Sequence, residues 1–291
     1  MTQVDTLCVI GTGLIGGSFC LALKRAGVCE NIIGAGRSEA TLIKAQQLNI
    51  IDRYQKDIAV AVKDADVIFV SVPLGATETV FKKIASGLAE SGNNNVVITD
   101  AGSSKQQVQL LAEKIFADHA SCFVAGHPIA GTENSGPEAA FASLYESCRV
   151  ILTPVENTNI AAIKRVTELW QVVGATVETM DAEHHDKVLA ATSHLPHVLA
   201  YALVHCLKNM DDIEDVFRFA AGGFRDVTRI ASSDPAMWRD ICLNNRQPVL
   251  QMMKRYKDEL DMIYNALDAN EGEVLMNVFA QAKQTRDKFT Q

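Results

Sequence analysis

Short apolar runs alternate with amphipathic segments from Thr6 to about Thr153. The runs are TLCVI, NIIGA, DVIFVSV, NVVITD, CFVAG and RVILT, and the segments between them include residues 14–26, 41–48 and 104–116. Strands that are apolar along their whole length and are joined by helices are typical of a parallel sheet covered on both faces. The pattern therefore predicts an α/β fold with a doubly wound, mostly parallel sheet.

The pattern changes near Asp181. Before it, NTNIAAIKRVTELWQVVG predicts one more helix, with Asn157 or Asn159 as its N-cap, and ATVETM predicts a short strand. After it, apolar residues recur at helical spacing and almost no strand signal remains. We therefore expect residues 1–181 to form a first domain and residues 182–291 to form an all-helical second domain.

Two stretches predict the main helices of the second domain. HDKVLAATSHLPHVLAYALVHCL is apolar on most faces, as expected for a helix buried in a bundle or against a partner chain. Asp234 followed by Pro235 predicts the start of a helix that continues through PAMWRDICLNNRQPVLQMMKRYKDELDMIYNAL. The apolar faces of residues 188–207 and of the final helices exceed what this helical layer buries alone, so we expect a homodimer.

Composition narrows the class of protein. Of the 291 residues, 48% are hydrophobic and 21% charged, and the net charge of −8 is spread without long blocks of one sign. These values predict a soluble protein that binds neither nucleic acid nor a membrane. The start has no basic leader and no apolar run approaches the roughly 18 residues of a membrane span, so we expect a cytoplasmic location. The seven scattered cysteines form no C-x-x-C pair, which argues against a disulfide framework and a metal site.

The stretch LCVIGTGLIGGSFCLAL carries the first chemical signal. Gly11, Gly13 and Gly16 have the G-x-G-x-x-G spacing between a predicted strand and a predicted helix. In this position the glycines allow a tight turn, a close approach to a pyrophosphate and close helix packing. We expect this loop, with Leu14 and Ile15 at the helix start, to bind a dinucleotide.

The end of the second predicted strand bears on the choice of dinucleotide. An acid usually stands there and accepts hydrogen bonds from the ribose 2′-hydroxyl of NAD. Here Gly36 occupies that place and Arg37 and Ser38 follow, which favours the 2′-phosphate of NADP. Glu39 is a displaced acid that keeps NAD as an alternative.

Several polar residues are candidates for chemistry. GHPIAG places His127 between a glycine and a proline at the end of the predicted strand CFVA, where a helix cannot continue. DAGSSK ends a strand on Asp100 and offers Ser103, Ser104 and Lys105 at the carboxyl edge of the sheet, where such folds bind ligands.

The helical part adds two more candidate groups. SHLPH places His194 and His197 three residues apart, with His185 earlier on the same predicted helix, so they form a polar stripe that needs partners. GGFRDVTR contains Arg225 and Arg229, whose forked guanidinium groups suit a carboxylate, although a structural salt-bridge cluster is an equal alternative.

Taken together, these stretches resemble the prephenate/arogenate dehydrogenase family of tyrosine biosynthesis. The resemblance spans essentially the whole chain and rests on the glycine loop, DAGSSK, GHPIAG, HDKVLAATSHLPH and GGFRDVTRIASSDPAMWRDI. It implies a Rossmann-type domain followed by a helical dimerisation domain. It also implies an oxidative decarboxylation that converts a cyclohexadienol into a para-substituted phenol.

The resemblance also implies roles for matching residues. His127 resembles the catalytic histidine that bonds the C4 hydroxyl of the substrate, and Ser103 resembles the serine that orients both. His197 and Arg229 resemble the substrate-binding pair, with Arg229 on a carboxylate, and Trp238 lies in the matching wall. His194 is a further candidate for the substrate site. Two alternatives stay open: a related dehydrogenase of hydroxy acids or imines, and a dinucleotide-sensing module without turnover.

Overall fold

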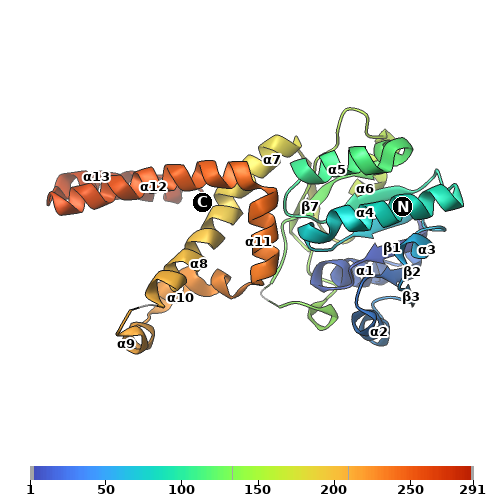
Figure 1. The fold of residues 1–291 in the computed structure, drawn as a ribbon, viewed down its shortest axis with the longest axis horizontal. Helices are drawn as coiled ribbons and strands as arrows, with labels where there is room; N and C mark the ends of the chain where they lie inside the picture. The colour runs from blue at the N-terminus through green and yellow to red at the C-terminus, as the bar shows by residue number, and fades with distance from the viewer. Residues whose placement is uncertain (1–2, 133, 209, 290–291) are drawn as a thin grey trace. The chain divides into compact units, whose positions relative to one another are not determined.

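The computed structural model describes residues 3–132, 134–208 and 210–289 (Figure 1). The chain divides into two compact units, residues 1–245 and residues 246–291. The first unit contains all of the candidate site residues, from Gly11 to Trp238. It continues past Asp181, where the sequence predicts the end of the first domain, and that division by residue range stays a prediction.

A six-stranded parallel sheet forms the centre of the first unit, with strand order β3-β2-β1-β4-β5-β6. This is the order of a doubly wound dinucleotide-binding sheet, so the predicted fold class is confirmed. Its strands are β1 (Val4–Ile10), β2 (Cys29–Ala35), β3 (Arg53–Gln55), β4 (Val67–Val70), β5 (Val97–Asp100) and β6 (Phe123–Val124).

Helices cover both faces of this sheet, as its continuously apolar strands require. One face packs against α1 and α6 around Phe19 and Trp170, and the other packs against α3, α4 and α5 around Phe81. The helices are α1 (Leu14–Ala26), α2 (Glu39–Gln47), α3 (Ile58–Ala61), α4 (Thr77–Ser91), α5 (Gln106–Phe116) and α6 (Ile160–Val172). Asn159 caps α6 through Ala161 N, as its sequence predicts.

A second, three-stranded sheet has the order β7-β8-β9, with β7 (Gly126–Pro128), β8 (Arg149–Leu152) and β9 (Thr176–Thr179). The expected display of His127 at the end of the CFVA strand is therefore wrong. That strand ends at Val124, and His127 lies within β7, paired antiparallel with Ile151. Pro128 is tolerated there because β7 is an edge strand.

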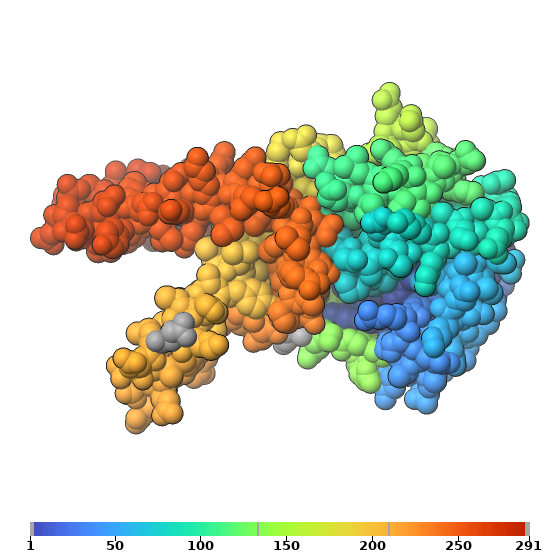
Figure 2. Space-filling model, in the orientation of Figure 1, coloured from blue at the N-terminus to red at the C-terminus, as the bar shows by residue number. Residues whose placement is uncertain are grey.

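The segment between β7 and β8 packs on the start of α1. Phe141 N donates to Ser18 Oγ, and Tyr145 OH donates to the carbonyl of Ile15. Figure 2 shows these light green residues beside the blue surface of α1 and α2. Short 3₁₀ turns occur at η1 (Leu74–Ala76), η2 (Ala117–Cys122) and η3 (Pro137–Ala139).

After β9 the first unit is helical. The predicted long helix of HDKVLAATSHLPHVLAYALVHCL is interrupted by one π turn, Ala190–His194, which ends two residues before Pro196. The elements are α7 (Ala182–Leu189), α8 (Leu195–Leu207), α9 (Ile213–Arg218), α10 (Gly222–Thr228), the 3₁₀ turn η5 (Arg229–Ser232) and α11 (Pro235–Asn244). Asp234 caps α11 through Met237 N, which confirms the predicted start.

The single helix predicted from Pro235 onward is wrong, because it breaks at Asn245. Asn245 has φ −101° and ψ 34° and separates α11 from α12 (Arg246–Asp268). Its buried side chain bonds groups of the first unit instead of pointing along a helix surface. Trp238 and Ile241 of α11 join the apolar core around α4, and Figure 2 shows α11 beside the cyan surface of η1 and α4.

The second unit consists of α12 and α13 (Gly272–Phe289). Both helices expose large apolar side chains, which are Leu250, Met253, Tyr256, Leu260, Met262, Tyr264, Leu267, Val274, Met276 and Phe279. Such a surface is larger than an isolated helical pair keeps in water, which agrees with the expected homodimer. Within the described ranges, no helix is long and apolar enough to cross a membrane.

Candidate functional site

The glycine loop between β1 and α1 has the shape that a pyrophosphate needs. Gly11 has φ +98°, and a Cβ there would lie 2.3 Å from the Ser71 carbonyl oxygen. A Cβ on Gly16 would lie 2.0 Å from the Gly11 carbonyl oxygen, so only glycine allows this packing. A Cβ on Gly13, in contrast, would have no heavy atom within 4 Å, so the space beside this residue is open.

The start of α1 fits the same ligand. Gly13 is its N-cap and supplies no side-chain cap, and the first turn, with Leu14 and Ile15, contains no acidic residue. Amide groups of this turn are therefore available to an anion at the positive end of the helix dipole. The loop and helix start fit the pyrophosphate of a dinucleotide.

The residues after β2 lie where the adenosine ribose of a dinucleotide would lie in this fold. Arg37 is exposed, and Ser38 caps α2 by accepting from Thr41 N at 3.3 Å. Gly36 has open space, because a Cβ there would meet only Leu42 Cδ2, at 4.0 Å. Glu39 accepts from Tyr54 OH at 3.4 Å and pairs with Lys56 at 3.3 Å.

A chain of hydrogen bonds begins at His127. Its Nδ1 lies 2.9 Å from Nε2 of His185, and Nδ1 of His185 lies 2.8 Å from Oδ1 of Asp186. All three residues are buried. Because Nδ1 of His127 is used in this contact, Nε2 is the nitrogen that remains for a substrate.

Asp186 is held by the start of α5. Its Oδ1 accepts from Lys105 N at 2.8 Å, and its Oδ2 accepts from Gln106 N at 3.0 Å. The carboxylate thereby satisfies two amide groups that the helix itself leaves unpaired. This arrangement fixes the position of α7 against α5.

Lys105 is buried and bonded within the same cluster. Its Nζ donates to Asp100 Oδ2 at 2.6 Å and to the carbonyl of Gly126 at 2.7 Å. Gly126 N donates to Asp100 Oδ1 at 3.1 Å. The Asp100–Lys105 pair therefore ties the end of β5 to β7, next to His127.

His194 belongs to a second branch. Asn245 Nδ2 donates to the carbonyl of Asp186 at 2.7 Å and lies 3.0 Å from Nδ1 of His194. A carbonyl oxygen only accepts, so the amide nitrogen faces both groups and His194 carries its proton on Nε2. The backbone of Ser103 lies beside the His194 ring. Within the described ranges, no hydrogen bond links Ser103 to His127.

His197, Trp238 and Arg229 form a third group. The rings of His197 and Trp238 stack with centroids 3.5 Å apart and an interplanar angle of 18°. Nδ1 of His197 lies 2.9 Å from the carbonyl of Ser193, which identifies it as the protonated nitrogen. Arg229 is exposed, and its charge is near enough to His197 to lower the pKa of that ring, after burial as the larger cause.

Burial keeps the inner histidines neutral at physiological pH. It lowers the pKa of His127 well below the usual value, with His185 and Lys105 acting in the same direction. Burial also lowers the pKa of His185, although the hydrogen bond to Asp186 opposes this effect. For His194 the pKa falls to about 4. A neutral His127 is the form that accepts a proton.

Comparison with known proteins identifies the family. The sequence matches "Prephenate dehydrogenase, nucleotide-binding domain" over residues 19–179 and "Prephenate dehydrogenase, dimerization domain" over residues 181–281. This chain belongs to the prephenate dehydrogenase family. The resemblance drawn from its sequence motifs is thereby confirmed, and the chain is a nicotinamide-dependent oxidoreductase.

Individual relatives agree with this assignment. The cyclohexadienyl dehydrogenase of Zymomonas mobilis is 36% identical over 290 residues, covering 98% of this chain and 96% of the relative. The prephenate dehydrogenase of Bacillus subtilis is 37% identical, covering 97% of this chain and 76% of the relative. The solved structure of A. aeolicus prephenate dehydrogenase with hydroxyphenyl propionate and NAD+ has a TM-score of 0.89 and 37% identity, with 98% of each chain covered.

The sequence motifs of this prephenate dehydrogenase do not show which residues meet behind His127. His185, Asp186, Lys105 and Asp100 form the buried network behind His127, together with Asn245. The HDK and DAGSSK motifs contain four of them, but only the fold shows that they meet. Asn245 lies outside these motifs, and its only sequence signal is that it is a polar residue on the apolar face of a predicted helix.

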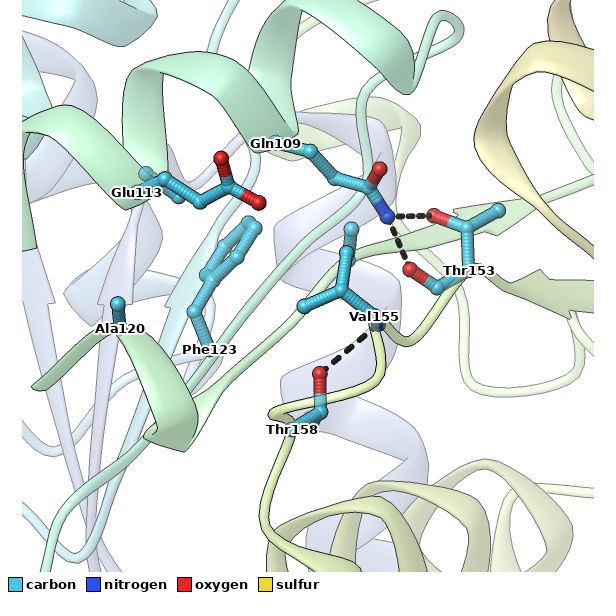
Figure 3. Close-up of a pocket in the computed structure, with 9 residues that line it drawn as sticks. Gln109, Glu113, Ala120, Phe123, Thr153, Val155 and Thr158 are labelled. Carbon is cyan, nitrogen blue, oxygen red and sulfur yellow. Dashed lines mark hydrogen bonds between the residues drawn. The ribbon is translucent and has the colours of Figure 1, made fainter.

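The pocket in Figure 3 is separate from this network and too small for a substrate. It lies between α5, η2, β6 and the loop after β8, and its volume is about 10 Å³. Gln109 Nε2 donates to the carbonyl and to Oγ1 of Thr153 there, and Thr158 Oγ1 accepts from Val155 N. A space of this size holds about one water molecule.

Proposed function

We propose that this protein oxidises and decarboxylates prephenate or arogenate, giving 4-hydroxyphenylpyruvate or tyrosine. The observation that carries the proposal is the buried, neutral His127. Its Nδ1 is engaged by His185, which leaves Nε2 as the base, in a chain that also has the glycine loop of a dinucleotide enzyme. The family match supplies the class of reaction.

His127 accepts the proton of the C4 hydroxyl of the substrate at Nε2. The glycine loop of Gly11, Gly13 and Gly16 would hold the nicotinamide dinucleotide, which would supply the acceptor for the hydride of C4. Loss of the ring carboxylate as carbon dioxide restores an aromatic ring. The role of the chain is to hold His127 neutral and oriented while positive charge develops at C4. General-base assistance of this kind contributes about 10²- to 10⁴-fold to the rate.

Other residues bind and orient the substrate. Arg229 pairs with a substrate carboxylate, and His197, fixed by its stack on Trp238, faces the same ligand. His194 and Ser103, which lie beside each other, contribute the remaining polar contacts, with Ser103 orienting the C4 hydroxyl.

The preferred cofactor is NADP. Arg37 is exposed and offers paired charge-assisted bonds to a 2′-phosphate, and Ser38 retains a hydroxyl proton to donate. Glu39, the alternative ribose ligand, is already paired with Lys56. Gly36→Asp with Arg37→Ala is expected to shift the preference to NAD by tenfold or more in kcat/KM, since the space beside Gly36 accepts a side chain.

The working form is a cytoplasmic homodimer. The exposed apolar side chains of α12 and α13 and the match to a dimerization domain support the dimer. All seven cysteines are free, as in a reducing compartment.

Steady-state turnover with both substrates crossed against both cofactors tests these proposals. We expect equal amounts of carbon dioxide and reduced nicotinamide, with NADP preferred. Reduction without carbon dioxide would indicate a hydroxy-acid or imine dehydrogenase, and cofactor binding without any turnover would indicate a sensing module. A kcat/KM for NAD equal to that for NADP would make Glu39 the ribose ligand.

A further inference from the structure

The structure links the proposed base to a buried carboxylate through a second histidine. The path runs from His127 Nδ1 to His185 Nε2 over 2.9 Å and from His185 Nδ1 to Asp186 Oδ1 over 2.8 Å. We propose that His185 and Asp186 form a proton relay that sets the tautomer of His127 and takes up its proton during the reaction. This inference rests on the proposed function of His127 as the base.

The direction of each hydrogen bond follows from Asp186. Its carboxylate accepts from the amides of Lys105 and Gln106, and an ionised carboxylate has no proton to donate. His185 therefore carries its proton on Nδ1, and its Nε2 is unprotonated and can only accept a hydrogen bond. The facing Nδ1 of His127 must then carry a proton, because two lone pairs 2.9 Å apart would make no bond. The lone pair of His127 is consequently on Nε2, as a base requires.

The buried cluster of Asp100, Lys105, His127, His185 and Asp186 has a net charge that favours the uptake of one proton. Asp100 and Asp186 contribute two negative charges and Lys105 contributes one positive charge, so two minus one leaves a single excess negative charge while both histidines are neutral. A buried cluster with one excess negative charge is stabilised by one added proton. The C4 hydroxyl of the substrate supplies that proton.

The proton transfer balances without another reactant. The O–H bond of the substrate breaks and a bond to His127 Nε2 forms. The Nδ1–H bond of His127 then breaks, and a bond to His185 Nε2 forms. The positive charge thus moves to His185, and His127 is again neutral. The reverse transfers return the proton to solvent after the product leaves.

The neighbours of the two rings favour His185 as the carrier of that charge. His127 faces His185 and lies near Lys105 and His194, all of which disfavour a cation on it. His185 faces the same Lys105, but it also contacts the carboxylate of Asp186 directly and lies near Asp100. A cation is therefore better accommodated one residue away from the substrate.

The decisive variant is His185→Gln, whose Oε1 can still accept the Nδ1–H of His127 but cannot take up a proton. His184→Gln is its matched control, because His184 is the adjacent, exposed histidine of α7. In single-turnover formation of the reduced nicotinamide we expect His185→Gln to be about 10- to 100-fold slower, with cofactor affinity and KM unchanged. The acid limb of its pH–rate profile should move to lower pH, because the proton must stay on His127 beside Lys105.

Two results would overturn the relay. One is a His185→Gln rate within threefold of the His184→Gln rate. The other is a slower rate with the acid limb unmoved and a lowered thermal stability, which a purely structural role produces. A wild type that turns over neither prephenate nor arogenate would instead refute the proposed function.

A second measurement needs no turnover. Imidazole ¹⁵N NMR of the unliganded protein, assigned with the His127→Asn and His185→Gln variants, reads the tautomer of each ring directly. We expect both His127 and His185 to carry a single proton on Nδ1 at neutral pH. A His127 ring protonated on Nε2 would refute the relay whatever the activity is.

Discussion

The two polar regions that we assign to the substrate differ in their access to water. His127 is buried, and the groups behind it are fixed by hydrogen bonds to backbone and side chains. Arg229 is exposed at the end of α10, and His197 beside it is only partly buried. A base needs a fixed tautomer and a low dielectric, whereas capture of an anion needs a cation that the ligand can reach. Changes in the first region should therefore act on kcat, and changes in the second on KM.

The largest expected effect is at His127. His127→Asn removes the only nitrogen that accepts the C4 proton, and kcat should fall by about 10²-fold or more. The dinucleotide loop is built by other residues, so cofactor affinity should stay unchanged in a fluorescence titration. Activity within threefold of the wild type would remove His127 from the mechanism. The expected division into a region that acts on kcat and a region that acts on KM would then be wrong.

Arg229 should give the opposite signature. Arg229→Ala removes a charge-assisted contact worth about 1.5–3 kcal/mol, so KM should rise roughly 10- to 100-fold with a smaller change in kcat. Arg225→Ala is the matched control, since Arg225 is an exposed arginine of α10, four residues before Arg229. If steady-state kinetics show the larger KM for Arg225→Ala, the carboxylate contact belongs to Arg225.

The two regions also differ in how well the sequence predicts them. The glycine loop is local: a strand, a turn and a helix follow one another in the chain, so spacing alone places Gly11, Gly13 and Gly16. His197, Trp238 and Arg229 were predicted as one group through a family resemblance, and the structure places them together. Their roles toward the substrate stay predictions.

The network behind His127 was not predictable in the same way. The network joins residues of β5, α5, β7 and α7 to Asn245. Its most distant members in the chain, Asp100 and Asn245, are 145 residues apart. Pattern rules describe periodicity within one element and carry no information about which elements meet. Pattern rules also fail to predict the helix break at Asn245. The helical periodicity of the sequence continues across the break, whereas the side chain of Asn245 makes a hydrogen bond to the distant Asp186 carbonyl.

The smallest expected effect concerns stability and comes from His194. Burial lowers the pKa of this ring from 6.5 to about 4 in the folded protein, whereas the unfolded chain keeps the usual value. Between these two pH values the unfolded state binds more protons than the folded state, so acidification favours unfolding. One pH unit in this window is worth about 1 kcal/mol. The contribution becomes constant about one pH unit above 6.5, where the unfolded ring is also neutral.

Urea unfolding measured at pH 6.5 and at about pH 5.5 tests this contribution, with His194→Gln as the comparison. The glutamine variant has no proton to gain, so its free energy of unfolding should fall by about 1 kcal/mol less than that of the wild type over this interval. His127 and His185 remain in both proteins and cancel in the difference. An equal fall in the free energy of unfolding of the two proteins would mean that His194 takes up its proton in the folded state. The region around His127 would then be no less accessible to water than the region around Arg229.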